Sequence, residues 1–185
     1  DLHRRRHSFP TRRSSDLSNG VIHLDDENLS LSPAHGRTRV GIGYAPEDRV
    51  IFPTLSVEEN LRLPCEVLGM REPEIQERIS HVLEVVPQLK PMLSRSGAAL
   101  SGGQGKMVAL GRALMVGKSL VLLDEPFQGL APALAQQYAE ALARLRQSRP
   151  DLAVIITESN AALLTDIPNQ ILTIERGSFV ESPTH

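Results

Sequence analysis

Two adjacent glycines stand at the start of a segment with helical spacing, where the backbone itself can do chemistry. The segment is "LSGGQGKMVALGRALM", residues 100–115, and Gly102 and Gly103 fall in its predicted first turn. Backbone N–H groups at a helix start have no partner within the helix and can bind phosphate. Ser101 and Gln104 match a capping box, so a well-capped core helix is the alternative. Each glycine costs a helix roughly 1 kcal/mol relative to alanine, which favours a ligand that must approach the backbone.

A pair of acids at the end of a buried strand is the second chemical feature. "LVLLDEP", residues 120–126, predicts a strand that ends in Asp124 and Glu125. Open α/β sheets bind ligands at the carboxyl ends of their strands, and successive side chains point different ways. Asp124 can then hold Mg²⁺ through its waters, while Glu125 orients or deprotonates the water that attacks a γ-phosphate. An isolated pair of acids is often only solvated, but its place after the glycine segment favours the chemical interpretation.

The glycine segment and the acids together resemble the ATP-binding cassette (ABC) ATPases, and the resemblance covers residues 18–185. It implies that Ser101, Gly102, Gly103 and Gln104 form the family's signature motif. That motif contacts the γ-phosphate of an ATP molecule held by the phosphate loop of a partner subunit. The resemblance also implies ATP and Mg²⁺ as the cofactors.

The family's own phosphate loop has no match in the sequence. The pattern Gly-x4-Gly-Lys-Ser/Thr must follow a strand and open a helix. "GRALMVGKS", residues 111–119, has five residues between its glycines and leads from a helix to a strand. We expect Gly117 there to cap the helix with a left-handed backbone. "SNGVIHLDDENLS" resembles the region that comes after the loop, so we expect a fragment without its N-terminal strands and phosphate loop.

Two further matches depart from the family pattern. "GIGYAPEDRVIFPTLSVEENL", residues 41–61, resembles the Q-loop segment, whose glutamine contacts Mg²⁺ and the attacking water. Glu47 stands in the place of that glutamine; it can bind a cation but adds negative charge near the phosphates. Ser159 stands where many members have a switch histidine, and it is shorter and uncharged. Both residues are catalytic candidates, and Glu47 is also a Mg²⁺ candidate. "GLAP", residues 129–132, matches the D-loop or simply starts a helix at Pro132.

Strand and helix patterns alternate along the chain and predict the fold. The predicted strands are "GVIHL", "VGIGYA", "SLVLL" and "LAVIIT", and a closing hairpin comes after them in "QILTIERGSFVES". Ser56 and Glu59 form a capping box that starts a helix, which Pro64 kinks or stops. We therefore predict an α/β fold, a P-loop NTPase (RecA-like) parallel-sheet core covered on both faces, with an inserted helical subdomain. The core comprises residues 18–51 and 100–185, and the subdomain residues 52–99.

The first seventeen residues do not match the rest of the chain. "DLHRRRHSFPTRRSSDL" holds five arginines and two aspartates. A basic arm for nucleic acid is the ordinary interpretation of such a run. "HSFPTRRSSDL" instead resembles the translation of a common sequencing adapter, so we predict that residues 1–17 are not native and carry no part of the fold.

Composition and charge exclude several classes of protein. The 185 residues have a net charge of −2, and 41% of them are hydrophobic and 23% charged, as in one soluble domain. This balance argues against a large nucleic-acid surface, and apolar runs such as "LAVII" are too short to span a bilayer. The single cysteine, Cys65, excludes an intrachain disulfide and is expected in the core.

The sequences of these motifs resemble one branch of the family, the second ATP-binding subunit of branched-chain amino-acid importers. Importers of urea or amides have similar motif sequences. The resemblance implies an ATPase at the cytoplasmic face of the cell membrane. Its partners would be a second ATP-binding subunit, membrane permease subunits and, indirectly, a solute-binding protein, with no nucleic acid. The alternatives are a cassette ATPase of translation or DNA repair, or a non-enzymatic fragment. Only residues 48–99 separate Glu47 from the signature, which leaves no room for the long coiled coil of chromosome-type members.

Overall fold

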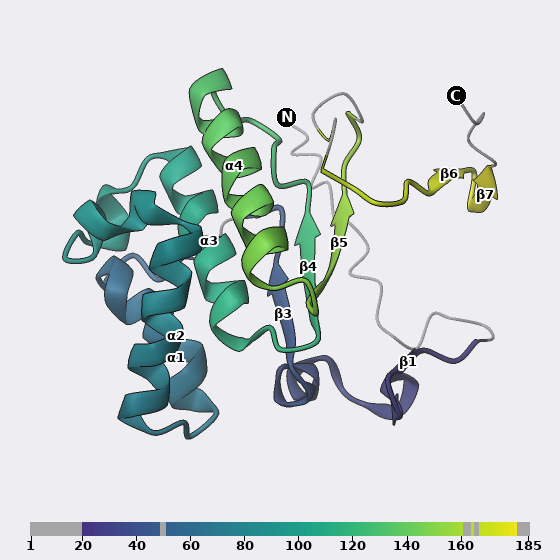
Figure 1. The fold of residues 1–185 in the computed structure, drawn as a ribbon, viewed down its shortest axis with the longest axis horizontal. Coiled ribbons are helices and arrows are strands. Elements are labelled where there is room, and N and C mark those ends of the chain that lie inside the picture. The colour runs from purple at the N-terminus through teal and green to yellow at the C-terminus, as the bar shows by residue number, and fades with distance from the viewer. Residues whose placement is uncertain (1–19, 49–50, 161–163, 165–166, 181–185) are drawn as a thin grey trace, which may run out of the picture.

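A three-stranded parallel sheet lies at the centre of the computed structural model, which describes residues 20–48, 51–160, 164 and 167–180. Its strands are β3 (Ile42–Ala45), β4 (Leu120–Asp124) and β5 (Ala153–Thr157), in the order β3-β4-β5. Asp124 is the register partner of Thr157, the last residue of β5. Because the strands are parallel, their carboxyl ends lie at one edge of the sheet (Figure 1).

Two helices pack against one face of this sheet. They are α3 (Gly102–Val116) and α4 (Pro132–Ser148), and each runs antiparallel to β4, so its N-terminus lies at the edge where the strands end (Figure 1). α3 approaches β3 closely, since a Cβ atom added to Gly43 would lie 2.1 Å from the carbonyl oxygen of Ala113. Glycine in β3 is therefore required by backbone contact between strand and helix.

The segment between β3 and α3 is mainly helical, as predicted for residues 52–99. It contains α1 (Val57–Val67), α2 (Glu72–Val85) and two short 3₁₀ helices, η4 (Pro87–Met92) and η5 (Gly97–Ala99). The capping box of Ser56 and Glu59 is present at the start of α1. Pro64 does not stop the helix, because α1 continues past it to Val67, and a kink at Pro64 stays a prediction. Whether this segment moves as a unit stays a prediction.

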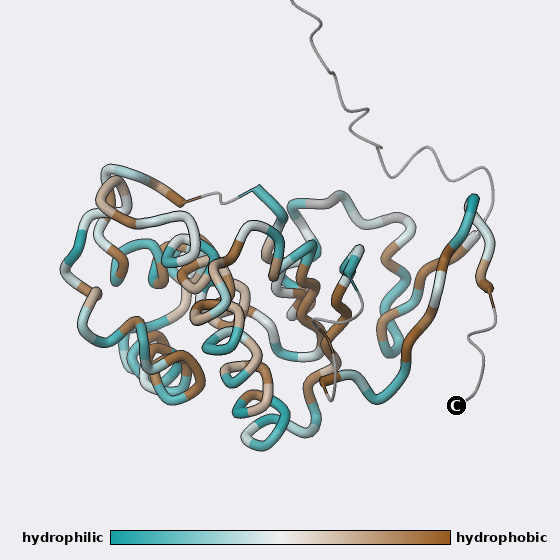
Figure 2. The backbone as a smooth tube through the Cα atoms, turned by 90° about the horizontal axis from the view of Figure 1, so that it is seen from above, coloured by the Kyte–Doolittle hydropathy of each residue, from teal (hydrophilic) through white to brown (hydrophobic). Residues whose placement is uncertain are grey.

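The apolar faces of these helices pack against the sheet and share one hydrophobic core with it. Figure 2 shows hydrophobic strands beside helices whose colour switches between brown and teal along each turn. The largest fully buried side chains come from both parts of the molecule: Leu61, Leu89, Met107, Leu110, Met115, Leu123, Tyr138 and Leu145. Cys65 is fully buried among them, and burial raises the pKa of its thiol. One continuous core therefore holds the helical segment against the sheet.

The opposite face of the sheet is exposed among the described residues. Tyr44 and Ile155 point to it from β3 and β5, and their exposed fractions are 55% and 54%. The expectation that helices cover both faces is thus not met by the part of the chain described. Two short hairpins lie away from the sheet (Figure 1): β1 (His23–Leu24) with β2 (Glu27–Asn28), and β6 (Thr173–Glu175) with β7 (Ser178–Val180). The 3₁₀ helices η2 (Leu29–Leu31) and η3 (Ala34–Val40) connect β2 to β3.

Two predicted caps have different outcomes. Pro132 occupies the first turn of α4, as expected. Gly117 caps α3, but its backbone is extended (φ −66°, ψ 107°) rather than left-handed. Its lack of a side chain is explained by packing, because an added Cβ atom would lie 2.4 Å from Cγ2 of Val121. The predicted non-native segment, residues 1–17, lies outside the described residues.

Candidate functional site

Asp124 ends β4 at the sheet edge and receives hydrogen bonds from both neighbouring strands. The Thr157 hydroxyl donates to Oδ1 over 2.5 Å, and the Tyr44 hydroxyl donates to Oδ2 over 3.3 Å. Burial raises the pKa of Tyr44, and the negative charges of Asp124 and, to a smaller extent, Glu47 add to the effect. Glu47 is exposed on the turn after β3, so Glu47 and Asp124 act on the same phenol. The two acidic candidates therefore share one end of the sheet.

Glu125 comes directly after Asp124 and is fixed at both its backbone and its side chain. Its φ of +44° lies in the left-handed region, which is uncommon for a residue with a side chain. Its N–H donates to the Thr157 carbonyl over 3.0 Å. Its carboxylate Oε2 accepts from the backbone N–H and the hydroxyl of Ser159, over 3.2 and 3.1 Å. The structure thus brings Glu125 and Ser159 together.

A fourth acid, Glu158, lies beside Glu125. Its Oε2 accepts from the Phe127 N–H over 3.4 Å and its Oε1 accepts from the Asn160 N–H over 3.3 Å. Burial, a hydrogen bond with the Glu125 carboxyl group and that group's charge raise the pKa of Glu158, although the bond from Asn160 opposes them. Two interacting carboxyl groups therefore meet at this end of the sheet, Glu125 from the end of β4 and Glu158 from the end of β5.

The glycine turn at the start of α3 has the predicted cap. Gln104 N–H donates to Ser101 Oγ over 3.3 Å, and Ser101 N–H donates to Gln104 Oε1 over 3.0 Å. Gly102 is exposed, whereas Gly103 is buried, and a Cβ atom there would lie 2.4 Å from Cδ1 of Leu134. Packing within the chain thus explains Gly103 without a ligand. The argument that a glycine at this helix start makes room for a ligand therefore rests on Gly102.

The glycine turn at the start of α3 and the acids at the end of β4 lie at the same end of the sheet (Figure 1). A lysine of α3 connects the helix to the residue that follows β4. Lys106, in the second turn of α3, donates from Nζ to the Glu125 carbonyl oxygen over 2.6 Å. Among the candidates, Asp124, Glu125 and Ser159 are linked through direct bonds or shared partners. Ser101 and Gln104 contact each other only within their own turn.

Sequence reasoning missed four residues of this site: Tyr44, Lys106, Thr157 and Glu158. Thr157 was detectable, since it ends the neighbouring parallel strand and such strands end together. Tyr44 lies within the quoted Q-loop segment and Glu158 directly precedes Ser159, but neither had an assigned role. Lys106 could not be found from its spacing, because its contact with Glu125 depends on how α3 lies against β4.

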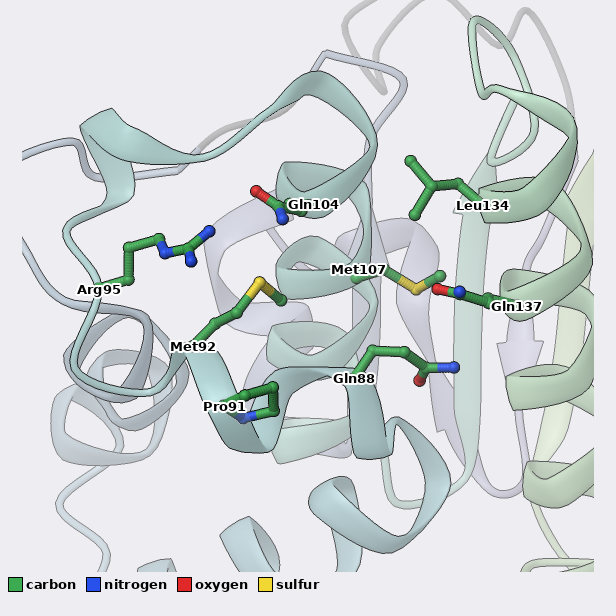
Figure 3. Close-up of a pocket in the computed structure, with 8 residues that line it drawn as sticks. All are labelled: Gln88, Pro91, Met92, Arg95, Gln104, Met107, Leu134 and Gln137. Atoms are coloured by element: carbon green, nitrogen blue, oxygen red, sulfur yellow. The ribbon is translucent and has the colours of Figure 1, made fainter.

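A groove runs beside the glycine turn, between α3, α4 and η4 (Figure 3). Its volume is about 360 Å³, and its lining mixes amides, thioethers and one arginine: Gln88, Pro91, Met92, Arg95, Gln104, Met107, Leu134 and Gln137. None of the acids of the sheet edge lines it. The groove is therefore separate from the surroundings of Glu125.

The residues at the sheet edge are of the type that Mg²⁺ uses. Magnesium is commonly bound through one or two carboxylates, with waters and substrate phosphates completing its shell. Asp124 supplies one carboxylate beside the Thr157 hydroxyl. Within the described ranges, no group of three or more His, Cys, Asp or Glu side chains can hold a metal alone. The donor set fits Mg²⁺ held together with a phosphate ligand, not an all-protein cage.

The fold is that of an ATP-binding cassette. Two solved structures of MJ1267, an ATP-binding cassette of an ABC transporter, match with TM-scores of 0.72 and 0.73. The sequence identities are 23% and 22%, and the matches cover 88–89% of this chain and 68–69% of those chains. The predicted α/β P-loop NTPase class is thereby confirmed.

The chain belongs to the ABC transporter family, whose sequence pattern it matches over residues 11–128. It is 34% identical to the branched-chain amino acid transport ATP-binding protein BraG of Pseudomonas aeruginosa, covering 92% of this chain and 72% of BraG. It is 29% identical to the probable branched-chain protein LivF of Archaeoglobus fulgidus, covering 87% and 67%. It is 32% identical to the lipopolysaccharide export protein LptB of Escherichia coli, covering 89% and 68%. The family match includes residues 11–17, and the non-native origin of residues 1–17 stays a prediction.

Proposed function

We propose that this chain is the ATP-hydrolysing subunit of an importer of branched-chain amino acids. The single observation that carries the ATPase assignment is the fixing of Glu125 beside Asp124 at the carboxyl edge of the sheet. The named functions of BraG and LivF support the substrate class. LptB supports a second candidate, export of lipopolysaccharide, at 32% identity.

Glu125 acts as the general base in this proposal. Its carboxylate takes a proton from water as the water oxygen bonds to the γ-phosphorus of ATP, and the bond from that phosphorus to the bridging oxygen breaks, which gives ADP and phosphate. The two bonds from Ser159 hold the Oε2 atom of this carboxylate in place. Ser159 thus orients the base in the place where many family members have histidine.

Asp124 is the proposed Mg²⁺ residue, with Glu47 as a second acid near it. When bound, Mg²⁺ would neutralise charge on the phosphates. The Thr157 and Tyr44 hydroxyls occupy one lone pair on each Asp124 oxygen, which fixes the carboxylate plane and leaves the other lone pairs available.

The exposed turn at Gly102 is proposed to serve the nucleotide of a partner subunit. The capping box uses the N–H groups of Ser101 and Gln104, whereas those of Gly102 and Gly103 have no acceptor within the helix. The absence of a side chain at the exposed Gly102 lets a phosphate approach them. Ser101 and Gly103 shape this turn through capping and packing, and Gln104 completes the cap.

The proposed partners derive from the transporter family. They are a second ATP-binding subunit, membrane permease subunits and, indirectly, a solute-binding protein, and no nucleic acid. The proposed location is the cytoplasmic face of the cell membrane. In the part of the chain that the structure describes, no helix has the length and apolar character needed to cross a bilayer.

Uptake by the complete transporter tests the substrate class. The transporter is reconstituted in vesicles with ATP on the side of the ATP-binding subunits, and in this chain a phosphate-loop segment of the family replaces residues 1–17. Radiolabelled leucine uptake is then measured. We expect ATP-dependent uptake that excess valine or isoleucine suppresses and that Glu125→Gln abolishes. ATP hydrolysis stimulated by lipopolysaccharide, with no leucine uptake, would favour the second candidate.

A further inference from the structure

Lys106 makes a contact that the proposed mechanism does not yet use. Its Nζ lies 2.6 Å from the carbonyl oxygen of Glu125, and the lysine is half-buried in the second turn of α3. Such a short bond from an ammonium group is a charge-assisted hydrogen bond, which is stronger than a neutral one. The same carbonyl accepts a weaker bond, from the Gln128 N–H over 3.2 Å.

The backbone of Glu125 needs such support. Three described residues other than glycine have a positive φ, namely Asp25, Glu125 and Arg176. Asp25 and Arg176 lie in the two-residue turns of the hairpins, where this conformation is usual. Glu125 instead lies between the end of β4 and the turn that leads to α4. A left-handed residue outside a hairpin persists only where neighbouring contacts fix it.

The carbonyl contact determines where the Glu125 side chain points. Its N–H is bonded to Thr157 and its carbonyl to Lys106, so both peptide planes around its Cα are fixed. Those planes set the direction of the Cα–Cβ bond, which carries the carboxylate to Ser159. Loss of the lysine bond leaves the second plane held only by the weaker bond from the Gln128 N–H, and the carboxylate is then less firmly positioned.

We propose that Lys106 is a positioning residue for hydrolysis, which holds Glu125 in its left-handed conformation and connects it to the signature helix. The inference rests on the proposed role of Glu125 as the base. Lys106 lies one helical turn after Gly102, so α3 carries both the turn proposed to face the partner's nucleotide and the group that holds this chain's own base. A displacement of α3 relative to β4 therefore changes the hold on Glu125.

Hydrogen exchange tests the structural half of the proposal without any nucleotide. Lys106→Met removes the ammonium group and keeps an unbranched apolar stem. We expect exchange at the N–H groups of Gln128 and Ser159, both bonded to Glu125, to become roughly tenfold faster, the loss expected for one charge-assisted bond. Lys106→Arg keeps a cationic donor and should restore most of the protection. Lys90→Met, at an exposed lysine of η4, is the matched control and should leave both N–H groups unchanged.

Steady-state hydrolysis tests the functional half, and it is measured on the complete transporter with a phosphate-loop segment of the family in place of residues 1–17 of this chain. We expect Lys106→Met to lower kcat roughly tenfold while KM for ATP stays within about twofold, and Lys106→Arg to recover most of kcat. A merely structural lysine would change stability without this separation of kcat from KM. Unchanged exchange at Gln128 and Ser159, or a wild-type kcat for Lys106→Met, would overturn the inference.

Glu125→Gln distinguishes a failure of the proposed function from a failure of the Lys106 inference. If Glu125→Gln leaves hydrolysis at this site unchanged, the base is wrongly assigned, and the Lys106 inference falls with it. If Glu125→Gln stops hydrolysis but Lys106→Met does not slow it, the base stands and Lys106 alone is wrongly assigned.

Discussion

Glu158 places a second carboxyl group against Glu125, and its titration should change the stability of the folded chain with pH. The folded-state pKa of Glu158 is raised, so the folded chain binds that proton more tightly than the unfolded chain. The stability linked to Glu158 is therefore fully present below its ordinary pKa and is lost as the pH rises through the raised value.

Glu158→Gln tests this sign. Glutamine stays neutral and can still accept a bond from the Phe127 N–H, so the variant should melt at a higher temperature than the wild type at pH 7.5. The difference should disappear at pH 4, where the Glu158 carboxyl group is itself protonated. Thermal unfolding at the two pH values measures it, with Glu84→Gln, an exposed glutamate of α2, as the control. An equal stabilisation at both pH values would contradict the assignment.

The two signature glycines should behave differently. Gly102→Asp adds a negative charge to an exposed helix start, which suits the helix dipole but opposes a phosphate. We expect an unchanged melting temperature and a loss of ATP-driven association with the partner subunit, measured by cross-linking. Gly103→Ala should instead change both stability and association little, because the roughly 1 kcal/mol that alanine gains in a helix offsets the contact of its Cβ atom with the end of the Leu134 side chain. Normal association by Gly102→Asp would favour the view that this turn is only a capped helix.

At the scale of elements, Asn60 joins the start of α1 to the loop before it. It is fully buried; its Oδ1 accepts from the Phe52 N–H, and its Nδ2 donates to the carbonyl groups of Phe52, Leu55 and Ser56. One side chain thus satisfies four backbone groups of the segment after the Glu47 turn.

Asn60→Ala should lower the free energy of unfolding by about 2 kcal/mol, because buried backbone groups lose their partners. Urea denaturation measures the change. Gln76→Ala, at an exposed amide of α2, is the control and should stay close to wild type. A change no larger than that of the control would show that the loop finds other partners.

Local patterns predicted most of these elements. The apolar runs "SLVLL" and "LAVIIT" became β4 and β5, and the capping boxes at Ser56 and Ser101 start α1 and α3 as expected. Pro64 does not stop α1, because packing of α1 against α3 outweighs one lost backbone bond. The conformation of Gly117 was misjudged because the atom that crowds it comes from β4. The packing of Gly103 against Leu134 was missed for the same reason, while its contact with a nucleotide stays a prediction. The site was predictable at the strand ends and not at Lys106, whose partner is set by tertiary packing.

At the scale of the whole molecule, the sequence contains the signature segment and the acids of the sheet edge but no Gly-x4-Gly-Lys-Ser/Thr pattern. Phosphoryl transfer depends on holding and neutralising the phosphates, which the described residues cannot do alone. We therefore predict no measurable Mg²⁺-dependent ATPase activity from residues 1–185 by themselves. A chimera in which a phosphate-loop segment of the family replaces residues 1–17 should gain activity with the partner subunits. Robust turnover by the 185 residues alone would show that another segment holds the phosphates.

The exposed sheet face fits the same prediction. Tyr44 and Ile155 leave apolar surface open on β3 and β5, next to the acids. A segment that covers this face would bury both side chains, so the chimera should also unfold at a higher temperature than the 185-residue chain.

The central claim is that Glu125 removes the proton from the attacking water. The direct measurement uses the assembled transporter in which the phosphate-loop chimera replaces this chain. ATP binding and ATP hydrolysis at the site that contains Glu125 are compared between the chimera and its Glu125→Gln variant. We predict that ATP binding is retained while turnover falls at least a hundredfold, because glutamine keeps the shape of the side chain and its bond from Ser159 but cannot take the proton. Unchanged turnover by Glu125→Gln would contradict the claim.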